Sequence, residues 1–463
     1  MSKPRKSSGK RRGQIPFTDS GNAKRLVKLH GDRIRYVANW NKWLTWDGHR
    51  WVLDHSNVNV MELAKDVSPE LLRKASKLKK DRRKSAVRWA LQSGNRAKIA
   101  AMVELARGVD EIAINHQQLD RDPYLFGVLN GVVDLRTGEL RDGEPGDLMM
   151  MASSVPFDAE ARAPRWLQAM TEWFPDKETR RYVQRLAGAA LIGEQRDHLL
   201  VIHYGDGGNG KGTLVRAIAY TMGDYFVTPH KALLVEQQHS PHDTERAKLF
   251  RKRLAVAVET DHRQRLNEAE VKNLTGGDAI SGRRMREDPW EFLPTHSLWL
   301  QTNYLPEIHG RDQGIWRRIR LVPWEIEFTD NNKDPDLDEK LRDEAPGILN
   351  WLIEGALAYQ EEGLDMPAVV ANATADYRGS EDILARFAID NDLVFERTLE
   401  IATADLTKAL KEWCEAENIH GVPSAKDLAP WLSSNGARRT RKRLESGENP
   451  VTVWVGVGFK GDE

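Results

Sequence analysis

A glycine-rich loop with one lysine is the segment of this sequence best suited to chemistry. The loop GDGGNGKGT follows the apolar run LLVIHY and precedes a helical pattern. Glycines let successive backbone N–H groups converge on phosphate oxygens, and the start of the following helix adds partial positive charge. The pattern predicts a nucleotide phosphate site. Its residues are Gly205, Gly207, Gly208, Asn209, Gly210, Lys211, Gly212 and Thr213.

The loop also predicts how the nucleotide and its metal are held. We expect Lys211 to reach the β- and γ-phosphates and a hydroxyl to bind Mg²⁺. The sequence departs from the strict pattern, because Gly212 stands where serine or threonine is usual and Thr213 comes one residue later. The expected cofactors are therefore ATP and Mg²⁺, with Thr213 as one metal ligand.

Polar residues end the two apolar strands predicted after the loop. The run LAVAVE ends in Glu259, and a carboxylate at the end of a buried strand is costly without a partner or a metal. We interpret Glu259 as the acid that holds Mg²⁺ or activates water. For Asp261 two interpretations stand equally: a second acid at this site, or an exposed acid in the loop. The run LWLQTN ends in Asn303, which we expect to contact the γ-phosphate or orient water rather than merely cap a turn.

Two adjacent arginines follow in the segment DQGIWRR. Packing both guanidinium groups inside one subunit is costly. An arginine offered to the γ-phosphate of a neighbouring subunit would stabilise charge in the transition state. The sequence therefore predicts an arginine finger, Arg317 or Arg318, with a surface salt-bridge pair as the alternative.

Basic residues around a turn predict contacts with DNA. Asp288 and Pro289 form a turn signal whose flanks can pair as a hairpin, and a second basic block, RRTRKR, lies near the C-terminus. Each phosphate contact from such residues makes binding more sensitive to salt. The candidate DNA-binding residues are Lys272, Arg283, Arg284, Arg286, Arg438, Arg439, Arg441, Lys442 and Arg443.

Composition limits the protein class. The 463 residues predict two to four domains at about 100–200 residues each. Net charge is zero, with 69 basic and 69 acidic residues, but residues 1–13, 71–98 and 438–443 are strongly basic. Three such blocks favour a polyanionic partner, with solvated surface charge as the alternative interpretation of each block. The single Cys414 excludes an internal disulfide. The sequence contains no apolar run of about 18 residues, so it predicts no membrane span. No secretory signal is visible either, so we expect a cytoplasmic location.

Alternating apolar strands and helical segments from Leu199 onward predict an α/β core with a parallel sheet. The expected elements include a helix over 211–222, a tryptophan-rich hairpin over 34–54 with an aromatic core, and a second hairpin over 128–142 that turns at Thr137-Gly138. The predicted division is a basic disordered tail (1–20), an N-terminal domain of aromatic hairpin and helices (21–125), a mainly helical collar-type domain (126–195), the core (196–330), a helical extension (331–379) and a winged-helix-like DNA-binding domain (380–463).

The order and spacing of these motifs resemble the superfamily III helicases of the AAA+ class, and most closely the phage and plasmid primase–helicase family, which includes the poxvirus primase–helicase. The resemblance covers roughly residues 125–380. It rests on GDGGNGKGT, LAVAVET, LNEAEVKNLTGGDAISGRRM, LWLQTNYLPEIHGRDQGIWRRIRLVPW and EAPGILNWLIEGALAY.

This resemblance implies an AAA+ P-loop core and an ATP-driven ring, usually a hexamer, that moves 3′→5′ on single-stranded DNA at forks. It makes Lys211 the Walker A lysine, Glu259 the Walker B acid and Asn303 the sensor, and it places Arg284 and Arg286 on a channel hairpin. The roughly 120 residues before the matched region show no apolar-Asp-x-Asp metal motif, so we expect no primase of its own and leave open a separate primase as partner.

The sequence thus predicts a replicative DNA helicase of a phage, plasmid or other mobile element in a bacterial host. An initiator ATPase that uses nucleotide as an assembly switch, without unwinding, is the alternative. A small-molecule kinase is disfavoured, because it requires neither the arginine pair nor the hairpin nor the basic tail.

Overall fold

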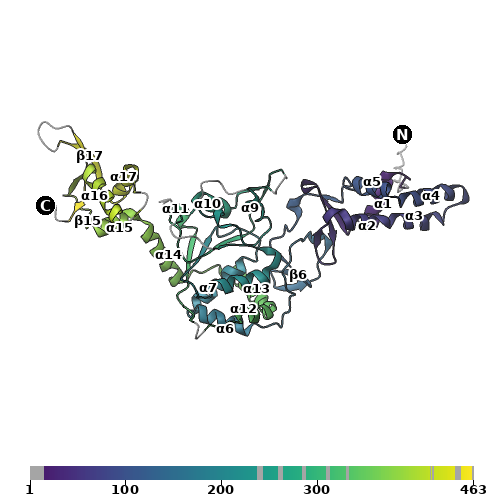
Figure 1. The fold of residues 1–463 in the computed structure, drawn as a ribbon, viewed down its shortest axis with the longest axis horizontal. Helices are drawn as coiled ribbons and strands as arrows, with labels where there is room; N and C mark the ends of the chain where they lie inside the picture. The colour runs from purple at the N-terminus through teal and green to yellow at the C-terminus, as the bar shows by residue number, and fades with distance from the viewer. Residues whose placement is uncertain are drawn as a thin grey trace, which may run out of the picture.

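The computed structural model describes residues 15–236, 243–258, 264–283, 288–308, 313–329, 333–417, 419, 422–443 and 450–460. Figure 1 shows an elongated chain with an N-terminal domain at one end, an α/β core in the middle and a C-terminal domain at the other end. The long helix α14 leads from the core toward the C-terminal domain.

The N-terminal domain combines a helical bundle with a small sheet of order β3-β2-β1-β4. Trp40, Trp43 and Trp51 are buried, which confirms the predicted aromatic core. Its first helix begins at Asp19, inside the range predicted as a tail, because the Thr18 side chain accepts a hydrogen bond from the Gly21 N–H and caps it. The elements are α1 (Asp19–His30), β1 (Ile34–Val37), β2 (Lys42–Trp46), β3 (Trp51–Leu53), α2 (Val58–Lys65), α3 (Val67–Ala75), α4 (Lys80–Ser93), α5 (Arg96–Ala106) and β4 (Ala113–Ile114).

The description of 126–195 as a mainly helical domain is wrong for its first half, whereas the hairpin predicted over 128–142 is confirmed. A three-stranded antiparallel sheet of order β5-β6-β7 precedes the helices. The reason is that Phe126, Val132 and Val133 lie in the core on short strands closed by tight turns. The elements are β5 (Leu125–Val128), β6 (Gly131–Asp134), β7 (Glu139–Arg141), α6 (Pro164–Trp173) and α7 (Lys177–Ala189).

The core is a five-stranded parallel sheet of order β14-β8-β13-β10-β9, as the strand–helix alternation predicts. The core strands are β8 (Leu200–Tyr204), β9 (Phe226–Val227), β10 (Leu254–Val258), β13 (Ser297–Thr302) and β14 (Ile319–Pro323). The core helices are α8 (Lys211–Met222), α9 (Asp243–Ala247), α10 (Glu268–Thr275), α11 (Gln313–Trp316), α12 (Leu337–Asp343), α13 (Ala345–Glu362) and α14 (Ala368–Glu381).

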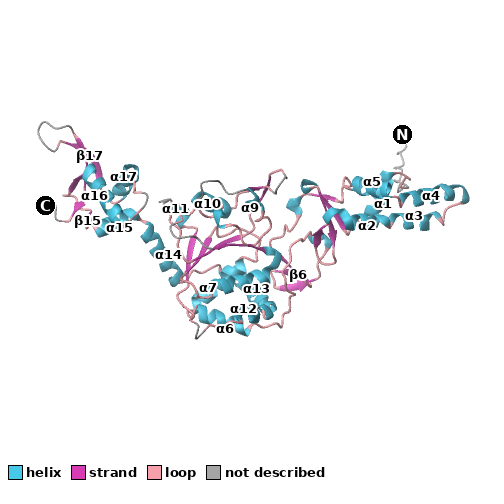
Figure 2. Cartoon of the chain, in the orientation of Figure 1, coloured by secondary structure: helices cyan, strands magenta, loops and turns pink. Residues whose placement is uncertain are grey.

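Helices cover both faces of this sheet (Figure 2). Val201, Val256 and Trp299 point into the larger core, which α6, α7, α8 and α13 complete. Leu200 and Leu300, one residue away on their strands, point into the opposite core with residues of α10, α11 and α14. Because both faces are buried, the strands are continuous apolar runs rather than alternating ones.

The C-terminal domain packs three helices against short strands, with sheets of order β16-β18-β17 and β15-β19. Phe387, Trp413 and the buried Cys414 lie in its core. The elements are α15 (Ile383–Asp390), β15 (Leu393–Val394), β16 (Glu400–Ala402), α16 (Thr403–Ala416), α17 (Ala425–Ser434), β17 (Arg438–Lys442), β18 (Val451–Val455) and β19 (Gly458–Phe459).

Helices α7 and α13 meet backbone to backbone at two glycines. A Cβ on Gly188 would lie 2.1 Å from the Gly355 carbonyl carbon, and a Cβ on Gly355 would lie 2.3 Å from the Gln184 oxygen. Backbone atoms cannot move aside cheaply, so we expect Gly188→Ala to lower the free energy of unfolding by about 3 kcal/mol. Thermal and urea unfolding measure the change.

Gly379→Ala is the matched control, because Gly379 lies in helix α14 and a Cβ added there would meet no atom within 4 Å. Alanine favours a helix over glycine, so this variant should gain about 0.5–1 kcal/mol. Equal effects of the two substitutions would contradict the close helix crossing.

Candidate nucleotide-binding site

The glycine-rich loop joins strand β8 to helix α8, and the helix begins at Lys211 as predicted. Gly210 precedes the helix in a left-handed conformation with φ 93°, and no side chain caps the helix start. The first N–H groups of a helix have no acceptor within the helix itself. This helix start can therefore accept an anion such as a phosphate.

The lysine of the loop is folded onto the loop's own backbone. Lys211 is 3 % exposed, and its Nζ donates to the carbonyl oxygens of Gly205 (2.6 Å) and Asp206 (2.9 Å) and to Asn209 Oδ1 (3.0 Å). Burial lowers the pKa of Lys211 to about 8. A phosphate would offer this ammonium group a stronger, charge-assisted partner than the carbonyls.

Two tryptophans from distant segments hold the loop. The indole of Trp173, at the end of α6, lies against Gly210, where a Cβ would come 2.2 Å from the indole nitrogen. Trp324, just after β14, takes the space beside Gly205, and its carbonyl accepts from the Asn209 side chain at 3.4 Å. The centroids of the two rings lie 5.9 Å apart. We name Trp173 and Trp324 the tryptophan clamp.

A buried histidine supports the clamp from the sheet. His203 lies on β8, and its Nδ1 accepts a hydrogen bond from Trp324 Nε1 at 3.1 Å. Burial, with a smaller effect from the charge of Lys211, lowers the pKa of His203 to about 3. The imidazole is therefore neutral at physiological pH and acts as an acceptor for the indole.

A cavity of about 300 Å³ opens beside the loop. The loop forms one wall, and the segment 323–327 after β14 forms the other. The Phe328 N–H donates to the Gly208 carbonyl at 3.0 Å and ties this segment to the loop. Such a volume is at the lower end of those that hold small ligands.

The carboxyl ends of three strands meet beside the loop. The register pairs Val258 with Gln301, and Thr302 with Tyr204, so β10, β13 and β8 end at one edge. The sequence-predicted acid Glu259 comes directly after Val258 and lies outside the described residues, as does Asp261. Asn303 follows β13 and is exposed at this edge.

Thr213 lies in the first turn of α8, where its hydroxyl accepts a hydrogen bond from Arg216 Nη2 at 3.0 Å. A hydroxyl oxygen is a ligand type that Mg²⁺ accepts, and the metal role of Thr213 stays a prediction. Among the described residues, no group of three or more His, Cys, Asp or Glu side chains could hold a metal ion.

The two adjacent arginines lie in different environments. Arg318 is half-buried, and its guanidinium donates to Thr275 Oγ1 (3.2 Å) and the Gly314 carbonyl (2.7 Å) of its own chain. Arg317 is exposed, and no side-chain hydrogen bond or ion pair joins it to another described residue. Of the two, Arg317 is the one whose side chain is available to a neighbouring molecule.

The predicted DNA-binding residues lie in two places. β11 (Ile280–Gly282) and β12 (Trp290–Phe292) pair as the antiparallel hairpin that the sequence predicts, with Arg283 exposed directly after β11. Arg284 and Arg286 lie outside the described residues, and Lys272 is half-buried on α10. The second place is strand β17 and the residue after it, all exposed: Arg438, Arg439, Arg441, Lys442 and Arg443.

The sequence did not predict the tryptophan clamp or Gln301. A Cβ on Gly212 would lie 3.7 Å from Gln301 Nε2, so this amide reaches the loop from β13. Trp324 ends the apolar run IRLVPW and looks like an ordinary core residue. Trp173 lies 37 positions before Gly210, and no local pattern links the two.

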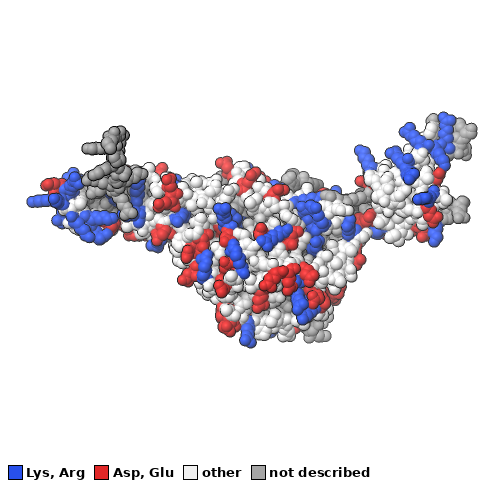
Figure 3. All heavy atoms as spheres, turned by 180° about the vertical axis from the view of Figure 1, so that it is seen from behind, with Lys and Arg blue, Asp and Glu red and all other residues white. Residues whose placement is uncertain are grey.

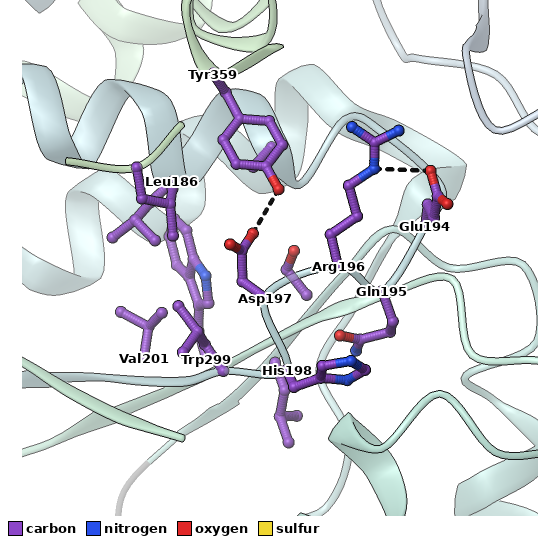
Figure 4. A pocket seen from close by; sticks show the side chains of 14 residues that line it. Leu186, Glu194, Gln195, Arg196, Asp197, His198, Val201, Trp299 and Tyr359 are labelled. Atoms are coloured by element: carbon purple, nitrogen blue, oxygen red, sulfur yellow. Dashed lines mark hydrogen bonds and ion pairs between the residues drawn. The ribbon is translucent and has the colours of Figure 1, made fainter. Parts of the chain in front are cut away.

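A second, much smaller cavity lies near the end of α7 (Figure 4). Its volume is about 30 Å³. Tyr359 donates to Asp197 at 2.5 Å, and Arg196 pairs with Glu194 at 2.9 Å. The space suits about one water molecule, so we do not consider it a catalytic site.

Two family models match the chain. Residues 23–175 match the model described as D5 N terminal like, and residues 203–318 match a family of unknown function, DUF5906. The first match ends just after Trp173 of the clamp, and the second runs from β8 to Arg318.

Curated relatives come from large DNA viruses. A protein of Acanthamoeba polyphaga mimivirus named as a helicase is 28 % identical over 340 residues, 68 % of this chain and 35 % of that protein. A protein of African swine fever virus named as a primase is 23 % identical over 323 residues, 64 % of this chain and 33 % of that protein. The chain is therefore similar to viral proteins named as a helicase and as a primase. It spans about a third of the length of these relatives.

A solved structure has a similar fold. The C-terminal region of NrS-1 matches with a TM-score of 0.51 and 10 % identity, over 94 % of this chain and 98 % of that one. This likeness shows the architecture only. Within the described residues, no helix is both long and apolar enough to span a membrane.

Proposed function

We propose that this chain is an ATP-dependent DNA helicase of the superfamily III, AAA+ class, acting in replication of a mobile or viral genome. The observation that carries the proposal is the position of the glycine-rich loop. It follows β8, the second strand in the order β14-β8-β13-β10-β9, and starts a helix without a side-chain cap. In chain order the strands of this sheet run five-one-four-three-two, and this order supports the proposed AAA+ core.

The site residues take distinct roles in this proposal. Lys211 and the loop N–H groups bind the β- and γ-phosphates, while Thr213 and Glu259 would hold Mg²⁺. When bound, Mg²⁺ would neutralise charge on the phosphate oxygens. Asn303, at the edge where β13 ends, would orient the attacking water.

In the proposed ring, Arg317 of one subunit supports ATP hydrolysis in the neighbouring subunit. Its side chain is exposed and is not engaged within the described chain, so a neighbouring subunit's γ-phosphate is a fitting partner. A closed ring, such as a hexamer, gives every site one arginine of this kind.

DNA contacts come from the hairpin and the C-terminal domain. The β11–β12 hairpin carries Arg283 at its described edge, and β17 presents exposed cations on a winged-helix-like domain. Single-stranded DNA in a channel and duplex DNA at the fork are the proposed substrates. A separate primase partner stays a prediction. A bacterial host also stays a prediction, because the relatives named above are viral.

The test is strand separation on a forked duplex with ATP, comparing the wild type with Lys211→Ala. We expect the variant to lose unwinding and to lower ATP turnover about 100-fold or more, because the phosphates lose their only loop ammonium. Circular dichroism confirms that the variant folds.

Equal unwinding by both proteins would contradict the proposal. Slow ATP hydrolysis by the wild type without any strand separation would favour the initiator instead, because a nucleotide switch needs turnover but no translocation.

A further inference from the structure

The hairpin of helices α3 and α4 carries a cluster of cations that its own domain does not neutralise. All seven are exposed, and Asp81 is the sole acid between residues 71 and 98. Within the described chain, no ion pair involves any of them. We name this the α3–α4 cation surface: Lys77, Lys79, Lys80, Arg82, Arg83, Lys84 and Arg88.

Other surface helices of this chain behave differently. Lys65 pairs with Glu62, Lys408 with Glu412, and Lys411 with Glu415, each three or four residues away. Such pairs stabilise a helix by about 0.2–0.5 kcal/mol each, and like charges at the same spacing destabilise it by similar amounts.

Helix α4 has the unfavourable arrangement. Lys80, Lys84 and Arg88 follow one another at intervals of four residues, which places them on one exposed face about 6 Å apart along the axis. Ala86 and Ala90 on another face are buried. In solvent this repulsion destabilises the helix, whereas the phosphates of a bound polyanion would attract the same cations.

A cavity lies beside the cation surface. It has a volume of about 920 Å³ and lies between α1 and the α3–α4 hairpin. Leu29, Leu71 and Leu78 form apolar lining, and Lys28 and Arg82 bring positive charge to it. Phe17, which is 42 % exposed, also lines the cavity and carries the Arg25 guanidinium 5.5 Å from its ring centroid.

Cations beside an apolar cavity with an exposed aromatic ring match the chemistry of single-stranded nucleic acid. The backbone phosphates need the cations, and an unstacked base needs an apolar or aromatic surface. Binding to a membrane surface would explain the cations but would not explain a cavity with a phenyl ring.

We propose that the α3–α4 cation surface and its cavity form a binding site for single-stranded nucleic acid in the N-terminal domain. Figures 1 and 3 place this domain at the opposite end of the molecule from the C-terminal domain, with Lys and Arg gathered toward both ends. The site therefore lies outside the proposed ATPase core, and binding at it requires no ATP.

The experiment measures the affinity of the full chain for labelled oligothymidine without ATP, by fluorescence anisotropy over a range of salt. The variant Lys80→Gln, Lys84→Gln, Arg88→Gln keeps helix propensity. We expect its affinity to fall about tenfold at low salt, and the slope of log affinity against log salt to fall by about 2, since each single-strand phosphate contact contributes about 0.7.

Two further variants separate charge from stacking. Phe17→Ala should weaken binding about fivefold without changing the salt slope, because a base loses its ring but no phosphate contact is lost. The matched control Lys177→Gln, Arg181→Gln, Lys340→Gln removes three exposed helical cations elsewhere and should leave affinity and slope unchanged.

An unchanged slope in the α4 variant, or the same loss in the control, would overturn the site. Binding to vesicles of anionic phospholipid without binding to oligothymidine would overturn it in favour of a membrane contact. Because ATP is absent, failure of unwinding by the wild type would count against the proposed helicase and leave this result standing.

Discussion

Arg317→Ala is expected to reduce ATP turnover by about 10³-fold or more while nucleotide affinity changes little. An arginine finger stabilises charge that develops only in the transition state, and its loss typically costs this much or more. The exposed Arg317 side chain makes no described contact that the fold needs. Steady-state turnover and binding of a labelled ATP analogue measure the two quantities separately.

Subunit mixing tests whether Arg317 acts across an interface. Combining Arg317→Ala with Lys211→Ala subunits should recover part of the turnover, because some interfaces join an intact loop to an intact arginine. No recovery at any ratio would contradict a finger in trans.

Arg318→Ala is the companion variant. Arg318 binds Thr275 and the Gly314 carbonyl within its own chain, so its loss should lower stability by about 1–2 kcal/mol. If Arg318→Ala instead abolishes turnover in a fully stable protein, the assignment of the two arginines must be exchanged.

Gly210→Ala is expected to abolish nucleotide binding, lowering affinity by about 100-fold or more. The residue has φ 93°, where a Cβ is strained, and the new methyl group would come 2.2 Å from the Trp173 indole nitrogen. The loop must move away from Trp173, and the N–H groups at the start of α8 then lose their alignment toward a phosphate. Titration with a labelled ATP analogue measures the loss.

Gly207→Ala is the control within the same loop. Nothing lies within 4 Å of a Cβ at Gly207, and its φ is outside the left-handed region. We expect this variant to keep nucleotide affinity within about threefold. Equal losses at the two positions would show that the loop tolerates no side chain anywhere and would contradict a specific role of the tryptophan clamp.

Much of the core was predictable because its signals are local. The loop, the helix over Lys211–Met222 and the apolar strands β8, β10 and β13 each occupy one short segment, and the structure confirms them. The hairpin of β11 and β12 was predictable for the same reason, since a turn signal lies between its strands.

The errors occurred where several signals compete. In 126–195 the hairpin over 128–142 was predicted correctly, but the later helical pattern decided the label of the whole domain, and the additional strand β5 was not predicted. The start of α1 fell inside a predicted tail, because a basic composition hid the cap at Thr18.

Residue types and their order along the chain already predicted a phosphate loop with candidate partners, because such a loop depends on a short run of glycines and one lysine. Tertiary structure decided which residues surround that loop. Trp173 reaches Gly210 only because α6 packs beside the sheet, and Arg318 turns inward only because α10 brings Thr275 to it. Contacts between distant segments depend on packing geometry, which leaves no pattern in the order of neighbouring residues.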